Sequence, residues 1–214
     1  MARNKYPEET VNLILDVSAK LFMEKGYDQT SIQDIINQLG GLSKGAIYHH
    51  FKSKEDILIA VMDKVTSNVE PKMETIRDAR NLTGLQKVQK MFAASLDEPE
   101  QLKVMAACPR LLENPRLLAI TITSMIDDVL PNYIEPVVMD GVKDGSIKTD
   151  YPAELAQFMI WMSNLWLNPV VYSMTEPELE NKIKFFTQLM DSIGIPVMDE
   201  TLKKRIQKMR SLIK

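Results

Sequence analysis

The sequence has a single cysteine, Cys108, among its 214 residues, so it can form neither an intrachain disulfide nor a cysteine-based zinc site. It has no run of 18 apolar residues, and its first residues, MARNKYPEE, lack the apolar centre of a secretory signal. We therefore expect a cytoplasmic protein that has no membrane partner and that keeps Cys108 as a small core residue.

Several kinds of catalytic pattern are also missing. The chain has no glycine loop that would cradle a phosphate, no HExxH motif, and no recognisable arrangement of nucleophile, base and orienting residue. Its two histidines, His49 and His50, are adjacent, whereas helical metal ligands sit four residues apart. The sequence therefore predicts a protein that is not an enzyme and that binds no metal or cofactor.

Positive and negative charges nearly balance overall but are unevenly distributed along the chain. The net charge is −3, which argues against a protein that coats nucleic acid over its whole surface. Residues 40–54, however, carry Lys44, Lys52 and Lys54 and no acidic residue. This predicts a small basic patch on an otherwise acidic protein.

Strand-like alternation does not persist anywhere, and proline and glycine divide the chain into helical segments of roughly 10 to 20 residues. The fold class that this predicts is all-α. Residues 1–54 read as three helices in a compact helix-turn-helix unit, and residues 55–214 as a larger helical region. Pro131 and Pro136 are expected to kink or split the apolar stretch 117–142.

The first helix is expected at about 8–25, because acidic residues open it and Gly26 follows it. A short second helix ends at Gly40 and Gly41, and two pairs could cap its start. One pair is Ser31 with Asp34 and the other is Thr30 with Gln33.

Ser43 can cap a third helix in which Ile47 and Phe51 share one face. At 100° per residue the opposite face carries Gly45, Tyr48, His49 and Lys52. In helix-turn-helix proteins the second helix of the motif enters the major groove of DNA, so this polar face is a candidate for reading it.

The residue types on and around this helix fit DNA. Lys44 could reach guanine O6 or N7, or a phosphate, and Tyr48 offers a hydroxyl donor. Gly45 and Ala46 remove bulk where the backbone must approach the groove. Further phosphate donors are His49, His50 and Lys54. An ordinary solvated helix face explains the same lysines, and the periodicity alone leaves both interpretations open.

Residues 10–58 resemble the DNA-binding domain of the tetracycline-repressor (TetR/AcrR) family of bacterial transcriptional regulators. The block SKGxxYxHFxxKxxL stands here within GLSKGAIYHHFKSKEDIL, residues 41–58. One departure is the turn LGGLS, which is a residue longer than the usual form. The resemblance implies that DNA is contacted by Ser31, Gln33, Lys44, Gly45, Ala46, Tyr48, His49, His50 and Lys54, with Lys54 on a phosphate.

The resemblance further implies that residues 55–214 bind an effector and form a homodimer. Helices at about 152–172 and 176–192 would pair with their copies in a second subunit, although a core within one chain explains the same apolar stripes. The dimer residues that we expect are Phe158, Met162, Leu165, Trp166, Phe186, Leu189 and Met190.

A small-molecule effector is the second partner that the resemblance implies. Methionine and aromatic residues in this region would suit it, although such stripes are also common in plain cores. The expected lining residues are Met91, Phe92, Met105, Cys108, Met125, Tyr133 and Trp161.

The sequence as a whole predicts a cytoplasmic DNA-binding transcriptional regulator, a homodimeric repressor that a small, mainly apolar effector releases from a palindromic operator in double-stranded DNA. The alternative is an all-α binding or carrier protein without specific DNA recognition. The basic, amphipathic residues 199–214 are expected to form an additional helix on the body.

Overall fold

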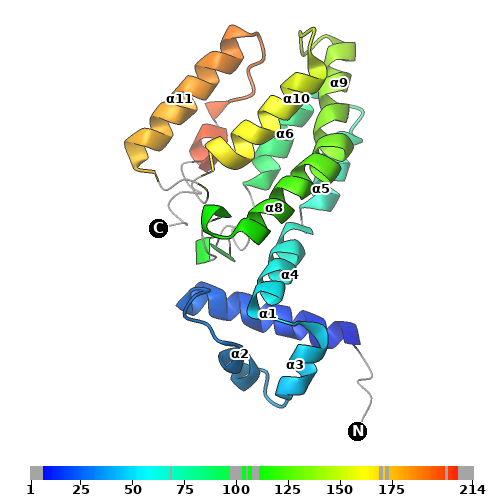
Figure 1. The fold of residues 1–214 in the computed structure, drawn as a ribbon. Coiled ribbons are helices and arrows are strands. Elements are labelled where there is room, and N and C mark those ends of the chain that lie inside the picture. The colour runs from blue at the N-terminus through cyan, green and yellow to red at the C-terminus, as the bar shows by residue number, and fades with distance from the viewer. Residues whose placement is uncertain are drawn as a thin grey trace. The chain divides into compact units, whose positions relative to one another are not determined.

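The protein is all-α wherever its structure is described, in agreement with the expected fold class (Figure 1). The computed structural model contains helices and connecting turns, and no strand occurs within the described part of the chain. The described residues are 7–67, 69–96, 103–104, 106–107, 111–168, 171, 174–200 and 202–206.

The chain divides into two compact units. Residues 1–68 and 100–109 form what we call the N-terminal unit, and residues 69–99 and 110–214 form the larger unit. The boundary expected after residue 54 therefore differs from the structural one, which falls after residue 68. The reason is that Ile57, Leu58 and Val61 are buried and that their helix packs against the first helix of the chain.

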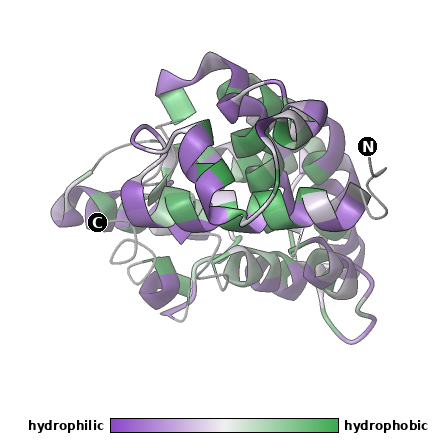
Figure 2. Cartoon of the chain, turned by 90° about the horizontal axis from the view of Figure 1, so that it is seen from below, coloured by the Kyte–Doolittle hydropathy of each residue, from purple (hydrophilic) through white to green (hydrophobic). Residues whose placement is uncertain are grey.

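The N-terminal unit contains the three helices that the sequence predicts, followed by a fourth. They are α1 (Pro7–Lys25), α2 (Ile32–Gln38), α3 (Lys44–His50) and α4 (Lys54–Ser67). The unit is closed by apolar side chains from all four helices, among them Ile14, Phe22, Ile35, Ile47 and Leu58, each fully buried. Figure 2 shows that the helices of the chain carry both hydrophobic and hydrophilic residues along their length.

The larger unit is built around one apolar cluster that runs from Val88 to Ile206. Its elements are α5 (Glu70–Arg77), α6 (Gly84–Ser95), the 3₁₀ turn η1 (Leu111–Glu113), α8 (Pro115–Ser124), the π-helix η2 (Met125–Ile134), α9 (Glu135–Asp144), α10 (Pro152–Trp161), the π-helix η3 (Met162–Trp166) and α11 (Glu176–Ser192). The helix expected at 152–172 is thus shorter, and its last turn is widened into η3.

Two glycines set the distance between α6 and α9. A Cβ atom at Gly84 would lie 2.0 Å from the backbone nitrogen of Gly141 and 2.5 Å from the carbonyl oxygen of Val137. An ion pair between Lys87 Nζ and Asp140 Oδ2 (2.7 Å) closes the same interface. Because no side chain intervenes, the two helices are held in backbone contact.

Helical structure continues through the apolar stretch 115–144, although its hydrogen bonding changes within it. Pro131 lies inside the π-helix η2, and Pro136 lies in the first turn of α9, where proline is tolerated. The prolines therefore alter the helix without interrupting it, because a π-helical turn accommodates the missing N–H. By length and composition alone this stretch could cross a membrane. This is weak evidence, because buried core helices meet the same two criteria.

Candidate nucleic-acid interface

The start of α2 is fixed by a capping box, and the structure selects the pair Ser31 and Asp34. Ser31 Oγ accepts a hydrogen bond from Asp34 N (3.1 Å), and Ser31 N donates to Asp34 Oδ2 (2.9 Å). The hydrogen bond from the Ser31 hydroxyl (2.6 Å) contributes most to lowering the pKa of Asp34 to about 2, and Lys25, 3.3 Å away, adds to the effect. Ser31 therefore orders the first turn of α2, where it is exposed.

Thr30 has a different role from the alternative that the sequence left open. Its side chain is buried, and its hydroxyl donates to the carbonyl oxygens of Gly26 (2.8 Å) and Leu21 (3.3 Å). Gln33 is exposed on α2 and donates from Nε2 to Asn37 Oδ1 (3.0 Å). Both Ser31 and Gln33 thus lie on the solvent side of α2, as a DNA contact requires.

The turn between α2 and α3 depends on two consecutive glycines. Gly40 has φ +59° and Gly41 has φ +136°, values that side-chain-bearing residues rarely adopt. A Cβ atom at either position would meet nothing within 4 Å, so the requirement is conformational and not steric. The extra residue of this turn is therefore accommodated by positive φ angles, and α2 and α3 still pack together.

Helix α3 has one buried and one exposed side. Ser43 caps it by accepting from Ala46 N (3.2 Å), and Ile47 (0% exposed) anchors it in the core. The outer side is exposed and carries Lys44, Gly45, Tyr48 and His49. Their backbone is held at both ends, because Phe51 N bonds to Ile47 O (2.9 Å) where the helix ends.

The side chains on this outer side lie near one another. Lys44 Nζ is 5.7 Å from the centre of the Tyr48 ring, and Tyr48 is 44% exposed. The His49 and His50 rings meet edge to face at 5.1 Å, and His50 is half-buried, as is Ala46. The structure thus brings the predicted α3 residues onto one rigid helix, with Ala46 and His50 at its margin.

Lys54 is placed differently from the prediction. Its ammonium group donates to the carbonyl oxygens of Tyr27 (2.8 Å) and Thr30 (2.9 Å) and lies 4.1 Å from the centre of the Tyr27 ring. The expectation that Lys54 holds a phosphate therefore has no support in this arrangement. Its donors are directed into the loop between α1 and α2, a use that sequence spacing could not indicate.

The predicted effector residues that the structure describes belong to the core of the larger unit. Met91, Met125 and Tyr133 are buried in its apolar cluster, and Phe92 and Trp161 pack against that cluster. The Arg77 guanidinium lies 5.6 Å from the centre of the Tyr133 ring, and burial raises the pKa of Tyr133. Met105 and Cys108 lie outside the described residues.

Two of the predicted dimer residues are wrong for a surface role. Phe186 (1% exposed) and Met190 (0%) point into the core of their own chain. The neighbouring side of α11 instead exposes Phe185 (59%), and the C-cap residue Ile193 is 46% exposed. Adjacent helix positions are 100° apart, so Phe185 and Phe186 lie on different sides of α11. The four-residue spacing of 185, 189 and 193 is the sequence pattern that indicates the outer side.

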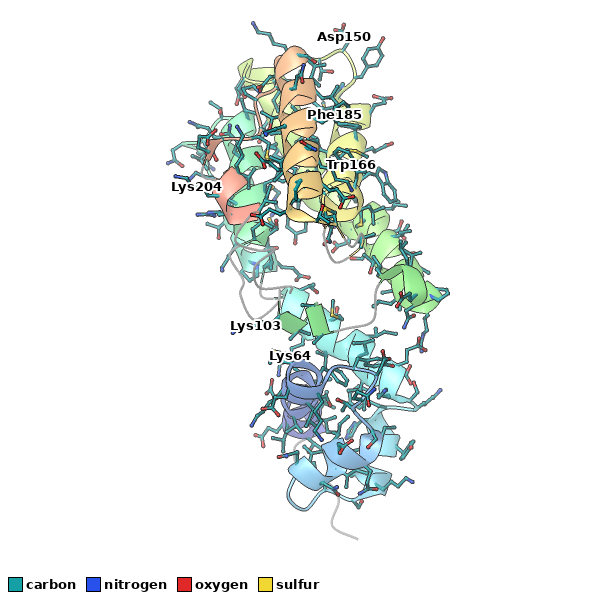
Figure 3. All side chains as sticks on the ribbon, turned by 90° about the vertical axis from the view of Figure 1, so that its left-hand side faces the viewer. Lys64, Lys103, Asp150, Trp166, Phe185 and Lys204 are labelled. Carbon is teal, nitrogen blue, oxygen red and sulfur yellow. The ribbon has the colours of Figure 1, made fainter. Side chains whose placement is uncertain are left out.

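One of the remaining predicted dimer residues, Trp166, lies beside this outer side. The Trp166 and Phe185 rings meet edge to face at 5.9 Å, and Figure 3 shows both side chains on the same part of the larger unit. Lys182 donates to the Trp166 carbonyl oxygen (2.7 Å) and lies over its ring. Half-buried residues complete the set: Phe158, Met162, Leu165 and Leu189.

Comparison with known proteins places these features in a family. Residues 14–61 match the family described as bacterial regulatory proteins, tetR family. The HTH-type transcriptional repressor KstR2 of Rhodococcus jostii is 29% identical over 170 residues, 73% of this chain and 78% of that protein. Residues 14–61 are therefore a DNA-binding region of the TetR family.

Two further matches agree with this assignment. The A-factor receptor protein of Streptomyces griseus is 39% identical over 74 residues, which are 35% of this chain and 26% of that protein. A transcriptional regulator from Cytophaga hutchinsonii has the same fold, with a TM-score of 0.62, 16% identity, and coverage of 96% and 95% of the two chains. Together with the match of residues 14–61, the curated relatives identify the chain as a DNA-binding transcriptional regulator.

Proposed function

We propose that this TetR-family regulator is a homodimeric cytoplasmic repressor, which binds a palindromic operator through α3 and the first turn of α2 and is released by a small, mainly apolar effector. The observation that carries the proposal is the two-sided build of α3. Ile47 fixes the helix in the core, while Lys44, Gly45, Tyr48 and His49 are exposed. Phosphates and base edges are the partners that such a surface suits.

The repressor role and the effector are supported by the relatives. KstR2 is named a transcriptional repressor, and the relative from Streptomyces griseus is named a receptor protein for A-factor. In this chain Met91, Met125 and Tyr133 lie within an apolar cluster, so an effector that binds there must enter between packed side chains. Such entry requires helices of the larger unit to move, and the resulting strain would oppose DNA binding reciprocally.

A second copy of the chain is the partner that the outer side of α11 favours. Phe185 and Ile193 are exposed there, and the Trp166 and Phe185 rings meet edge to face. Aromatic residues of this kind are enriched in protein interfaces. Two copies would present two α3 helices to two half-sites of the operator, which explains why the operator is expected to be palindromic.

The decisive experiment uses Gly45. A Cβ atom at Gly45 would meet only Ser43 Oγ, at 3.8 Å, so Gly45→Ala fits the free protein and should stabilise α3 by about 0.5 to 1 kcal/mol. If α3 enters a groove at Gly45, the same methyl group should weaken binding to duplexes from the protein's own promoter region. Fluorescence anisotropy at several salt concentrations measures this affinity, and urea unfolding measures stability.

The result that would overturn the proposal is equally specific. A regulator should bind such duplexes with an affinity that falls steeply as salt rises, because bound phosphates release counterions. Wild-type protein that binds no duplex at low salt would exclude DNA binding altogether. Gly45→Ala protein that binds as tightly as wild type would show that α3 does not approach the groove at this position.

A further inference from the structure

Tyr27 lies in a loop that is closed by its own hydrogen bonds. The loop begins at Gly26, whose φ is +81°, and Thr30 N donates to Tyr27 O (3.1 Å). The Tyr27 ring meets the Phe22 ring edge to face at 5.3 Å. Ser31, the cap of α2, follows directly, so the position of this loop sets where α2 begins.

Lys54 holds the loop from the start of α4. Its ammonium group reaches two carbonyl oxygens that are three residues apart, those of Tyr27 (2.8 Å) and Thr30 (2.9 Å), and the Asp28 carbonyl oxygen lies 3.5 Å away. Three carbonyl dipoles and an aromatic face are a favourable environment for a cation. A lysine used in this way orders the chain and directs its N–H donors to carbonyl oxygens instead of a phosphate.

A second segment of the chain binds Tyr27 through its backbone N–H, whereas Lys54 binds its carbonyl oxygen. Tyr27 N donates to the carbonyl oxygen of Ala107 (3.0 Å). Ala107 belongs to residues 100–109, which group with the N-terminal unit although the chain before and after them belongs to the larger unit. Val104 in this segment is buried (2% exposed), and Figure 3 labels its neighbour Lys103.

We propose that Lys54 is a positioning residue for DNA recognition and that the main chain of Tyr27 is the junction through which residues 103–107 control the placement of α2. The inference rests on the proposed function, because it concerns how the DNA-reading helices are held. Residues 103–107 are joined along the chain to α6 on one side and to η1 and α8 on the other. A change in the larger unit that withdraws Ala107 from Tyr27 N therefore loosens the loop, Ser31 and α2 together.

The first test compares Lys54→Met with Lys52→Met, a control that removes an equal charge from an exposed position two residues earlier. Lys54→Met should weaken operator binding about tenfold, since it removes hydrogen bonds from a charged donor. The slope of log affinity against log salt should stay unchanged. Lys54→Arg should restore most of the affinity, because a guanidinium also donates to two carbonyl groups.

A phosphate contact would give a different result. The salt slope of Lys54→Met would then shrink by about 0.9, the value for one released counterion, and that outcome would overturn the proposal. The slope of Lys52→Met calibrates the loss of one exposed charge. Thermal unfolding of each variant shows whether lost affinity comes from lost folding. If Lys54→Met is too unstable for the binding test, the hydrogen-exchange test described next still examines the proposal, because it needs no DNA.

The second test needs neither DNA nor effector. Amide hydrogen exchange followed by NMR reports the Tyr27 and Thr30 amides one by one. Lys54→Met should accelerate exchange at Thr30, and Val104→Ala, which loosens the 103–107 segment, should accelerate it at Tyr27 and weaken operator binding. Unchanged exchange in both variants, or faster Tyr27 exchange with unchanged DNA affinity, would contradict the proposal that Tyr27 links residues 103–107 to the placement of α2. A wild-type protein that binds no duplex would instead contradict the proposed function alone.

Discussion

The two units of this protein use glycine in opposite ways. In the N-terminal unit Gly45 faces open space, and a Cβ atom there would meet only Ser43 Oγ at 3.8 Å. In the larger unit a Cβ atom at Gly84 would lie 2.0 Å from the backbone of Gly141. One glycine leaves room for a molecule outside the chain, and the other lets two helices of the chain touch.

The predicted binding residues differ between the units in the same way. On α3 the residues expected to contact DNA are exposed on a helix whose other side is buried. In the larger unit Met91, Met125 and Tyr133 are part of the core itself. In the proposed function, DNA would therefore meet a surface that is already formed, whereas an effector would bind only if packed helices separate. This difference suits a sensor, because only the second event changes the protein.

The largest effect is expected from Gly84→Ala. The added methyl group would overlap backbone atoms of α9, which cannot rotate away as a side chain can, so α6 and α9 must move apart. We expect a loss of about 3 kcal/mol in the free energy of unfolding. Urea unfolding followed by circular dichroism measures it, with Gly45→Ala as the matched control. A change in the free energy of unfolding no larger in magnitude than that of the control would show that the two helices are not held in backbone contact.

A smaller effect, on binding alone, is expected from Lys44→Ala. Lys44 is exposed in the first turn of α3, so its removal should leave folding unchanged. If it reads a base, specific operator binding should weaken by about 1 to 3 kcal/mol, and preference should relax at one base pair. Titration of a panel of single-base operator variants measures both. An equal loss on every duplex would identify a phosphate contact and remove Lys44 from sequence reading.

Gly41→Ala tests the turn that joins α2 to α3. The φ angle of +136° is strained for alanine, and with no neighbour within 4 Å the cost is conformational, about 1 to 2 kcal/mol. Because the turn sets the relation between the two helices, operator affinity should fall along with stability. Lost stability with full affinity would show that the turn relaxes without moving α3.

Local patterns explain which parts of this structure the sequence could predict. The Ser31–Asp34 capping box and the Ser43 cap involve partners only three residues apart, so spacing and residue type predict the Ser43 cap and give the Ser31–Asp34 box as one of two candidate pairs. The clamp by Lys54 joins residues 24 and 27 positions apart, and the contact of Gly84 with Gly141 joins different helices. No periodicity encodes such pairs.

Helix α11 shows a subtler limit. Its apolar residues were recognised, but Phe185 and Phe186 are adjacent in sequence and point to different sides. The larger unit's core uses Leu179, Ile183, Phe186 and Met190, so the outer side falls to Phe185, Leu189 and Ile193. Which of two overlapping stripes is buried depends on the neighbouring helices, and these are positioned by contacts between distant residues.

The smallest effect concerns pH and belongs to the N-terminal unit. The pKa of Asp34 is lowered from 3.8 to about 2, chiefly by the Ser31 hydroxyl. Because the folded form has the lower pKa, the carboxylate stabilises the fold fully above about pH 4, and this contribution is lost as pH falls toward 2.

Asp34→Asn lacks that carboxylate at every pH. The difference in urea midpoint between wild type and Asp34→Asn should therefore be constant above pH 4 and shrink below it, since the other carboxylates titrate equally in both proteins. A difference that does not change between pH 5 and 2 would show that Ser31 caps α2 without help from the charge of Asp34.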